Sequence, residues 1–456
     1  MLALAWLSWL LLLGPTRESA ARSAPVYDAR GLFADRLTHD DRARLRSCPC
    51  SGRPNNSDEQ LSSLASLCLP VDFTGKRPRK EVFAFSVATD DRWKHYDWDQ
   101  VLYALLLDPR RPLTTVAWNE DKQLLCHAHS KGVKVVVKHN FDDVEQLCNT
   151  TARQNWIKLG AASGMLACLS FCLGLAEKQT NGAPLFCGLQ ATYTQIVENY
   201  ADGVNIDTEK PMHGATAQCM ASLVYELRHE LEQHALTKNA QITFDVPWAP
   251  RGVDGRYYPW RELADAADFL FVMSYDMRSQ VYDACVAGAN APRALVQQGL
   301  EEFLLAFDIA PDKLVLGVPW YGYDYPCLGP QQGAVIDDAS RCRIRPVPFF
   351  GAPCSDAAGG QVDYADVQRL VKRHGLVEQW DPTTETPFVW YAQEGHQSQI
   401  WFDNPRSLRA KYRLVRELGL RGVGMWNADT LDYSGGGSAA NDTRLMWSSL
   451  AEAFAS

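Results

Sequence analysis

From residue 81 onward, short runs rich in β-branched and aromatic residues alternate with longer amphipathic runs. Short runs of this composition are typical of strands, and apolar residues at helical spacing are typical of helices that cover a sheet. Helices are predicted between most of the strands, for example at residues 217–236, 293–307 and 407–418. The eight predicted strands lie at residues 82–87, 114–118, 133–138, 203–207, 241–246, 269–274, 314–319 and 422–426.

This alternation of strands and helices predicts an α/β fold with a parallel sheet. Eight such strands are the number that closes a (β/α)8 TIM barrel. A doubly wound open sheet is the alternative. It is disfavoured because no glycine-rich phosphate-binding fingerprint follows the first predicted strand.

The connection between the seventh and eighth predicted strands, residues 320–420, is too long for a plain loop. We predict that it holds an insertion followed by the last helix of the barrel. Residues 388–391 and 399–402 have the composition of a small antiparallel strand pair. The cysteines of this connection are expected to hold it together by disulfides; they are Cys327, Cys342 and Cys354.

The N-terminal residues predict export from the cell's interior. Residues 2–13 form an apolar run that is followed by Gly-Pro and small residues. This is typical of a secretory signal peptide, assigned to residues 1–24, and the run is too short for a membrane span. Residues 25–80 are then predicted to form an arm with a Cys-rich segment, and residues 81–456 the barrel domain.

Residues 160–189 do not follow the alternating pattern, and residues 159–176 carry no charge. That length reaches the threshold for a membrane helix. A span is rejected because it would place the third and fourth predicted strands on opposite sides of a membrane. We interpret the segment as an atypical insertion or an artefact of the gene model. If it is a true insertion, its cysteines are expected to stay unpaired; they are Cys168, Cys172 and Cys187.

The amino-acid composition and net charge indicate which classes of binding partner are disfavoured. The hydrophobic content of 46% and the charged content of 22% are ordinary for a globular protein. The net charge of −9, from 54 acids and 45 bases, disfavours nucleic acid and anionic membranes as partners.

Export also gives meaning to the cysteines and to the Asn-x-Ser/Thr sequences. Disulfides are expected among the 13 cysteines, and the odd number leaves at least one thiol unpaired within the chain. Glycosylation is expected at Asn55, Asn149 and Asn441. No Cys/His cluster has the spacing of a zinc site. The Cys-His-Ala-His run at residues 126–129 comes nearest and is interpreted as the end of a helix.

The polar residues that most suggest chemistry lie at the fourth predicted strand. Asp202, Asp207 and Glu209 place three acids within eight residues. Because residues two apart in a strand point to the same side, Asn205, Asp207 and Glu209 share one face. At the carboxyl end of a barrel strand this face would border a substrate pocket, where one acid can keep another protonated. A strand end with solvated acids is the alternative, although clustered titratable groups favour a functional site.

Residues 202–209 resemble the Asp-Gly-x-Asp-x-Asp-x-Glu signature of family 18 glycoside hydrolases. Asp202, Gly203, Asp207 and Glu209 match it, whereas Asn205 stands where the family's chitinases usually carry Asp. Asn at this position is found in the lysosomal di-N-acetylchitobiase branch of the family. The resemblance covers residues 81–452 apart from residues 160–189.

Two further strand ends resemble the same family. The Met273-Ser274-Tyr275-Asp276 run at the sixth strand is similar to a Met-x-Tyr-Asp element, in which Tyr contacts the substrate N-acetyl group and Asp contacts a sugar hydroxyl. The alternative is a core tyrosine with an ordinary hydrogen-bond partner. Trp426, at the eighth strand, matches the Trp that forms the floor beneath the reacting sugar. It could also plug the mouth of the barrel.

The strand ends also carry aromatic residues that suit a sugar-binding cleft. Trp320 and Tyr321 follow the seventh strand. A segment with Asp403 and Lys411 resembles a family element that is more structural than catalytic. The predicted substrate contacts are Asn205, Met273, Asp276, Trp320, Tyr321 and Trp426.

The resemblance implies substrate-assisted hydrolysis with retention of configuration. Only one residue separates Asp207 from Glu209, so neither faces the other across a sugar, as the two carboxyls of most retaining glycosidases do. Glu209 is expected to protonate the glycosidic oxygen and later to activate water. Asp207 is expected to bind the acetamide N–H, and Tyr275 the acetamide oxygen. No metal or cofactor is expected.

Asn205 also leads to a prediction about pH dependence. It removes one negative charge beside Asp207 relative to chitinases with Asp at that place. Because a like charge disfavours ionisation of a carboxyl, an Asn205→Asp change is expected to move the acidic limb of the pH–rate profile to higher pH.

The implied activity is hydrolysis of the GlcNAc-β-1,4-GlcNAc core of Asn-linked glycans in the lysosome, with release of the reducing-end GlcNAc. The partners would be N-acetylglucosamine oligosaccharides, and the chain is expected to be monomeric. A secreted chitinase is one alternative, disfavoured because no Cys-rich chitin-binding module follows the barrel. A sugar-binding lectin is another, disfavoured because the acid at Glu209 is present. A product made inactive by residues 160–189 is a third.

Overall fold

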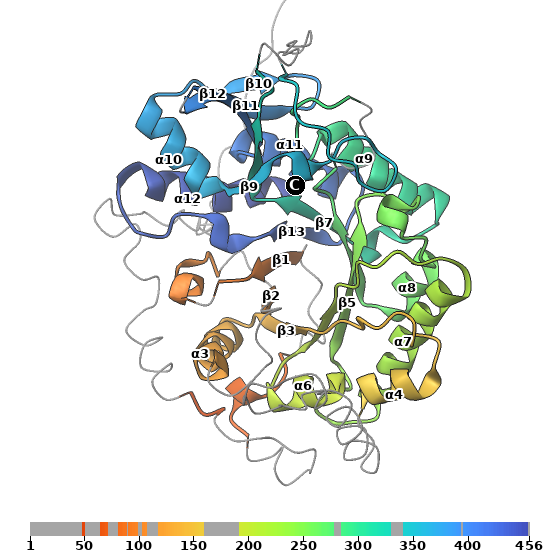
Figure 1. Cartoon of the computed structure of the whole chain (residues 1–456). Coiled ribbons are helices and arrows are strands. Elements are labelled where there is room, and N and C mark those ends of the chain that lie inside the picture. Colours follow the sequence, from red (N-terminus) through yellow and green to blue (C-terminus); the bar gives the residue numbers. More distant parts are fainter. Residues whose placement is uncertain are drawn as a thin grey trace, which may run out of the picture.

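Eight parallel strands close into a barrel in the computed structural model of the chain (Figure 1). Around the barrel the order is β1-β13-β7-β6-β5-β4-β3-β2, and β2 pairs with β1. The barrel strands are β1 (Glu81–Ser86), β2 (Tyr103–Leu106), β3 (Lys134–Lys138), β4 (Gly203–Ile206), β5 (Gln241–Pro247), β6 (Phe269–Met273), β7 (Leu314–Pro319) and β13 (Gly422–Trp426). The structure describes residues 48–50, 64–71, 81–88, 90–98, 103–106, 117–158, 191–277, 284–329, 341–393 and 395–454.

The helices lie around the outside of the strands (Figure 1). The longest of the described helices, α7, buries a stripe of residues three and four apart, as an amphipathic helix against a sheet must. Its buried residues are Ala217, Met220, Ala221, Leu223, Val224, Leu227 and Leu231. The helices are α3 (Ala117–Ser130), α4 (Thr150–Ile157), α6 (Thr192–Glu198), α7 (Gly214–Glu232), α8 (Trp260–Ala266), α9 (Arg293–Glu301), α10 (Tyr364–His374), α11 (Pro405–Glu417) and α12 (Gly437–Ser449).

The TIM barrel predicted from the sequence is confirmed, and its predicted strands agree with the observed ones to within one residue at each end, except for the second. The second prediction, residues 114–118, is contradicted at residues 117–118, and residues 114–116 lie outside the described part of the chain. The second strand is β2, and residues 117–118 begin helix α3. The run Tyr-Ala-Leu-Leu in β2 is uniformly apolar, and such a run cannot be told from a buried helix by periodicity.

The interior of the barrel is filled by aromatic rings. Phe83 and Phe85 of β1 meet Phe271 of β6 at ring-centroid distances of 5.6 and 4.9 Å. Strands β7 and β13 leave room for Phe271 because they carry glycine. A Cβ on Gly317 would lie 2.4 Å from its ring, and a Cβ on Gly424 would lie 2.6 Å from it. The interior is therefore a packed core, and a substrate can reach only its mouth.

The insertion after β7 forms a second sheet, of five strands in the order β10-β11-β12-β8-β9. The predicted strand pair is confirmed as the antiparallel pair β11–β12. Cys327 pairs with Cys342 inside the insertion, as expected, whereas Cys354 pairs with Cys285 and ties the insertion to the segment after β6. The strands are β8 (Tyr321–Pro326), β9 (Gly360–Asp363), β10 (Gln379–Asp381), β11 (Thr386–Gln393) and β12 (His396–Phe402).

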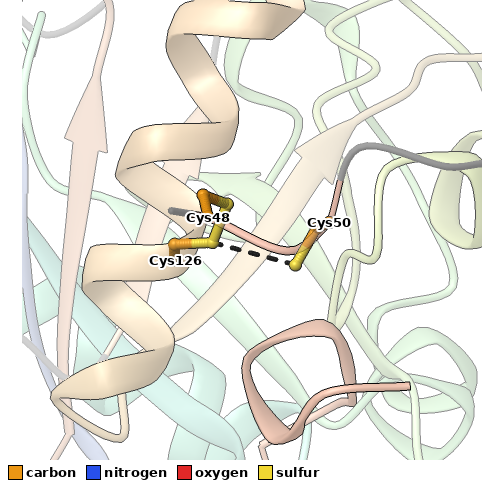
Figure 2. Close-up of side chains that lie close together, drawn as sticks. All are labelled: Cys48, Cys50 and Cys126. Carbon is orange, nitrogen blue, oxygen red and sulfur yellow. Dashed lines mark hydrogen bonds between the residues drawn. A yellow bond between two sulfur atoms is a disulfide. The ribbon is translucent and has the colours of Figure 1, made fainter. Parts of the chain in front are cut away.

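One disulfide attaches the N-terminal Cys-rich segment to the barrel, and a second closes within the segment. Cys48 is bonded to Cys126 of α3, and Cys50 to Cys68. Figure 2 shows the Sγ of Cys50 beside the first of these bonds, 3.8 Å from the Sγ of Cys126. The interpretation of residues 126–129 as a helix end is confirmed, because α3 ends at Ser130.

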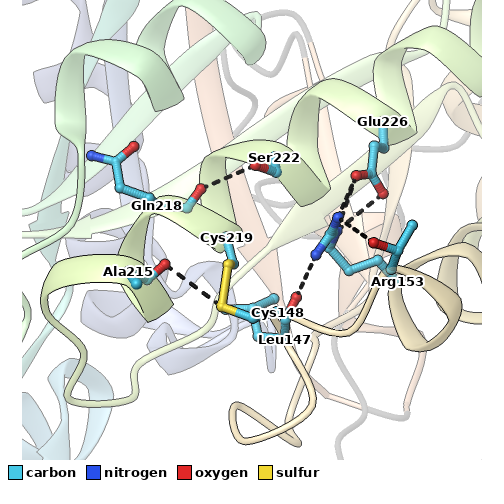
Figure 3. The surroundings of a disulfide bond; sticks show 9 residues. Leu147, Cys148, Arg153, Ala215, Gln218, Cys219, Ser222 and Glu226 are labelled. Atoms are coloured by element: carbon cyan, nitrogen blue, oxygen red, sulfur yellow. Dashed lines mark hydrogen bonds and ion pairs between the residues drawn. A yellow bond between two sulfur atoms is a disulfide. The ribbon is translucent and has the colours of Figure 1, made fainter.

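A further disulfide, Cys148–Cys219, joins the segment before α4 to α7 (Figure 3). Beside it, the guanidinium group of Arg153 donates to Glu226 of α7 at 2.6 Å and to the Leu147 carbonyl at 2.9 Å. The two elements are thus held by one covalent bond and one charged pair. The disulfide and the charged pair anchor the chain on the N-terminal side of residues 159–190.

Several predictions concern residues that lie outside the described part of the chain. They are the signal peptide, most of the arm, Asn55, and residues 160–189 with Cys168, Cys172 and Cys187. The two other predicted glycosylation sites, Asn149 and Asn441, are exposed, as a glycan requires. None of the described helices has both the length and the apolar character needed to cross a membrane.

At the base of the barrel, the Asp202 carboxylate joins three segments. It accepts hydrogen bonds from the backbone N–H groups of Val71 and Val135, both at 2.6 Å, and its Oδ2 lies 2.9 Å from Nε2 of His129. The side chains of Asp202 and His129 are each 1% exposed. Asp202, the first acid of the motif, therefore has a structural role at the opposite end of β4 from Glu209.

This pair predicts a pH-dependent contribution to stability. Burial lowers the pKa of His129, but the charge of Asp202 and the hydrogen bonds raise it more, so that the pKa lies above its ordinary value. A raised pKa in the folded state gives stability that is fully present below the unfolded-state pKa of about 6.5 and is lost as the pH rises through the folded-state pKa. Urea unfolding should therefore show that His129→Gln costs more free energy of unfolding at about pH 5 than at about pH 8. An equal cost at the two pH values would contradict the prediction.

Candidate active site

Two acids of the motif, Asp207 and Glu209, lie at the carboxyl end of β4. Val204 and Ile206 point outward into the core between sheet and helices, so Asn205 points into the barrel. Asp207 follows the strand and is 9% exposed, and the side chain of Glu209 is 50% exposed at the mouth. The sequence prediction that these residues share one side is consistent with their mutual electrostatic interactions.

Asp207 is held by groups from β3 and the segment after it. Lys138, the last residue of β3, donates to Oδ2 of Asp207 at 2.7 Å, and the Asp207 N–H donates to Oδ1 of Asn140 at 2.8 Å. The other carboxylate oxygen, Oδ1, is buried and has no partner among the described residues. A buried acceptor without a partner is rare in proteins and marks a place where a ligand donor can bind.

Lys138 was missed by the sequence analysis, although a signal exists. Val135 and Val137 pack outward, so the alternation of β3 points Val136 and Lys138 into the barrel. A lysine at an inward position near a strand's carboxyl end needs a negatively charged partner. Burial lowers the pKa of Lys138, but Asp207 outweighs this, so the pKa is raised and the ammonium group stays charged.

Asp245 of β5 is a further carboxyl of the site and was also missed. It is 2% exposed, and its Oδ1 accepts a hydrogen bond from Nδ2 of Asn205 at 2.8 Å. Burial, and next the charge of Asp207, raise the pKa of Asp245 well above its ordinary range. The signal was an acid at the inward position of a strand whose outward residues, Ile242 and Phe244, are fully buried.

The structure changes the reason for the prediction about Asn205. Its side-chain amide binds Asp245 and, at 2.9 Å, Oγ1 of Thr243, so the first group to respond to a charge at this position is Asp245. In Asn205→Asp, two carboxyls would meet where an N–H now donates, and one of them must stay protonated. The acidic limb of the kcat/KM profile is still expected to move to higher pH, by about one unit. Profiles of both proteins on one substrate would check this, and an unmoved limb would contradict it.

Glu209 has the electrostatic environment of a general acid. Burial of its carboxyl group, and next the charge of Asp207, raise its pKa to about 7, against the opposing effects of Arg256 and Lys138. Half of the side chain is nevertheless exposed, so a ligand can reach it. Nη1 of Arg256 donates to Oε2 at 3.1 Å. An acid with a pKa near neutrality can hold a proton and release it.

Two strands place a group of tyrosines beside these acids. Tyr275 follows β6, is 8% exposed and interacts electrostatically with Asp245, Asp207 and Glu209. Its neighbour Asp276 accepts hydrogen bonds through Oδ1 from two tyrosines of β8, from Tyr321 at 2.5 Å and from Tyr323 at 2.9 Å. The predicted Met-x-Tyr-Asp element and Tyr321 therefore lie together at the mouth. Tyr323 was not predicted.

Met273 and Trp426 are the last residues of two barrel strands, β6 and β13, at the mouth. Trp426 ends β13, is partly exposed, and its ring centroid lies 5.2 Å from that of Phe85. Both residues border the aromatic interior of the barrel. The predicted alternatives for Trp426, a sugar-binding floor and a plug of the barrel mouth, are both compatible with this position.

The predicted substrate contact at Trp320 is wrong. Its side chain is fully buried, and its Nε1 donates to the hydroxyl of Tyr412 on α11 at 3.0 Å. Its ring packs edge-on against Trp447 of α12 at 5.0 Å. Because residues alternate along an extended chain, Trp320 faces the helices while Tyr321 faces the mouth.

Comparison of the whole sequence with known protein families identifies the family of this chain. A family model described as "Glycosyl hydrolases family 18" matches residues 189–430. The chain belongs to glycoside hydrolase family 18. It is therefore a glycoside hydrolase, and the family resemblance drawn from residues 202–209 is confirmed.

Curated relatives within family 18 match most of the chain. Di-N-acetylchitobiase of Rattus norvegicus is 38% identical over 419 residues, which cover 90% of this chain and 94% of the relative. The Homo sapiens protein of the same name is 37% identical over 389 residues and covers 84% and 86%. "Probable di-N-acetylchitobiase 2" of Dictyostelium discoideum is 32% identical and covers 89% and 91%.

Solved structures of family 18 chitinases share the barrel. A Cycas revoluta chitinase, crystallised with allosamidin, has a TM-score of 0.56 at 18% identity and covers 81% of this chain and 99% of its own. A class V chitinase of Nicotiana tobaccum has a TM-score of 0.55 at 16% identity, with the same coverage. At these identities the likeness establishes the fold.

Proposed function

We propose that this hydrolase cleaves the β-1,4 bond of the GlcNAc-GlcNAc core of Asn-linked glycans and releases the reducing-end GlcNAc. The observation that carries the proposal is the pairing of two unlike carboxyls at one strand end. Glu209 has a raised pKa and is open to a ligand, whereas Asp207 is buried and presents an oxygen without a partner among the described residues. One group suits proton donation and the other suits an acetamide N–H.

In the first step, Glu209 donates its proton to the glycosidic oxygen while the bond from that oxygen to C1 breaks. The carbonyl oxygen of the substrate's own acetamido group forms the new bond to C1 and gives a cyclic oxazolinium ion. Oδ1 of Asp207 accepts the acetamide N–H and stabilises the positive charge, while Lys138 holds the carboxylate through Oδ2. Tyr275 lies in reach of the same carboxyls and would hold the acetamide oxygen in line with C1.

In the second step, the ionised Glu209 accepts a proton from water as the water oxygen bonds to C1. The bond between C1 and the acetamide oxygen breaks, and the acetamido group is restored. Two displacements at C1 retain its configuration. This route needs no second carboxyl across the sugar, which agrees with the position of both acids at the end of β4.

The raised pKa of Glu209 supports work in an acidic compartment such as the lysosome. A carboxyl with a pKa of about 7 is about 99% protonated at about pH 5, so nearly every enzyme molecule holds the proton that the first step consumes. The curated relatives of 37–38% identity carry the name di-N-acetylchitobiase, which supports cleavage of the GlcNAc disaccharide.

The test uses tri-N-acetylchitotriose with a fluorescent label at the reducing end, incubated at about pH 5 with the secreted protein. Release of labelled monosaccharide, absent with Glu209→Gln, would establish the proposed activity. Labelled disaccharide, or internal cleavage of longer chains, would overturn it in favour of a chitinase. Binding without turnover would overturn it in favour of a lectin. Fractionation of expressing cells checks the lysosomal location.

A further inference from the structure

Arg256 connects the segment after β5 to the catalytic strand end. Its side chain is 4% exposed, and its guanidinium group makes two charged contacts. Nη1 donates to Oε2 of Glu209 at 3.1 Å, and Nη2 donates to Oδ2 of Asp254 at 2.9 Å. A buried guanidinium needs acceptors for its N–H groups, and here the carboxyl predicted to donate the proton supplies one of them.

The backbone on both sides of Arg256 is held in a defined conformation. Asp254 has a φ of 55°, in the left-handed region that non-glycine residues seldom adopt, between Gly252 at 76° and Gly255 at 74°. Such conformations concentrate at functional sites, where surrounding contacts hold them. The Met212 N–H donates to the Gly255 carbonyl at 3.1 Å, and the Tyr257 N–H donates to the Met212 carbonyl at 2.9 Å.

A tyrosine strengthens the same connection. The hydroxyl of Tyr258 lies 3.0 Å from the carbonyl oxygen of Thr208 and 2.5 Å from that of Lys210, which are the two residues that flank Glu209. The main chain around Glu209 is therefore fixed by the segment after β5. The side chain of Glu209, in contrast, is half exposed and is contacted by Arg256.

We propose that Arg256 is a positioning residue of the active site, which holds Glu209 through Oε2 and directs Oε1 toward the glycosidic oxygen. Asp254 binds the other side of the guanidinium group, so that the positive charge of Arg256 is shared between two carboxyl groups. This inference rests on the proposed role of Glu209 and names the residues that set the orientation and the pKa of its carboxyl group.

Charged and titratable groups from several elements face Glu209. Each of two variants removes one of these charges, that of Arg256 or that of Asp254. Removal of Arg256 takes away a positive charge, which raises the pKa of Glu209, whereas removal of the Asp254 charge takes away a negative one, which lowers it. A role in fold stability alone predicts no such pair of opposite changes. The facing groups are Asp207, Lys138, Asp245, Asp254, Arg256, Tyr258 and Tyr275.

The experiment measures kcat/KM for di-N-acetylchitobiose against pH in four variants. Arg256→Met is expected to move the alkaline limb up by about one pH unit, and Asp254→Asn is expected to move it down by about half a unit. Asn tolerates the left-handed conformation of Asp254, so this variant should fold. Arg256→Lys keeps the charge and should restore the limb, with kcat/KM still about tenfold below wild type because an ammonium group cannot bridge two carboxyls as a guanidinium does.

The control is Arg251→Gln. Arg251 lies on the same segment but is 64% exposed and pairs with Glu302, so its loss should leave the profile unchanged. A second readout does not need activity: carbon-13 NMR titration of labelled glutamate carboxyls, with Glu209 assigned by its absence from Glu209→Gln. The Glu209 signal should titrate at higher pH in Arg256→Met and at lower pH in Asp254→Asn.

The two readouts separate this inference from the proposed function. If the wild type does not release GlcNAc but the Glu209 signal shifts in opposite directions in the two variants, the function is wrong and the role of Arg256 stands. If the wild type is active and neither the limb nor the signal moves, or both variants shift them in the same direction, the role of Arg256 is overturned.

Discussion

Glu209→Gln is expected to lower kcat for di-N-acetylchitobiose by at least about 10³-fold while the affinity for the substrate changes little. Glutamine has the shape of glutamate, and its amide oxygen can still accept the hydrogen bond that Arg256 donates to Oε2. It cannot donate a proton with the ease of a carboxylic acid, so the leaving sugar would depart as an alkoxide. The loss should therefore fall on the chemical step.

Steady-state kinetics and calorimetric titration with the substrate at about pH 5 would check both halves of this prediction. The control is Glu232→Gln, an exposed glutamate at the end of α7 that should leave kcat and affinity unchanged. If Glu209→Gln kept more than about a tenth of the wild-type kcat, another group would have to be the acid.

Lys411→Met is expected to reduce the free energy of unfolding by about 3–5 kcal/mol. Lys411 of α11 and Asp403, just after β12, are both completely buried and form an ion pair. The hydroxyl of Ser407 also donates to Oδ1 of Asp403 at 2.5 Å, while Oδ2 has no partner among the described residues. Without Lys411 the carboxylate would be left in the core with one hydrogen bond in place of its counter-ion.

Urea unfolding of single and double variants would test this. Asp403→Asn combined with Lys411→Met should recover a large part of the loss, because no buried charge then remains. Lys372→Met serves as the control, since Lys372 and Asp442 form an exposed ion pair and such pairs contribute at most about 1 kcal/mol. A loss for Lys411→Met as small as that of the control would contradict the prediction.

Local sequence was informative wherever the relevant physics is local. The alternation of β-branched runs with amphipathic runs located seven barrel strands, because a buried strand and a covering helix each impose their own spacing. It was misleading at β2, where a uniformly apolar run has no period. Glu209 and Asp207 could be found from one segment because they share a strand end.

The same local reasoning was wrong at Trp320 and incomplete elsewhere. An aromatic residue at a strand end can face the mouth or the helices, and only the direction of the chain there distinguishes the two. Cys354 illustrates the limit for disulfides: it lies within the insertion, as the sequence shows, but its partner Cys285 lies 69 residues away beyond β7. Connectivity of this kind depends on distances in space.

What the sequence by itself determined is the parallel eight-stranded barrel, the strand end that carries the acids, and membership of a family that hydrolyses glycosidic bonds. What only the tertiary structure decided is the set of charges that makes those acids different from each other. Lys138 of β3, Asp245 of β5 and Arg256 beyond β5 reach β4 because neighbouring barrel strands end at the same mouth. The pKa of a carboxyl depends on charges and burial within a few ångströms, and in a barrel those neighbours come from residues far apart in the chain.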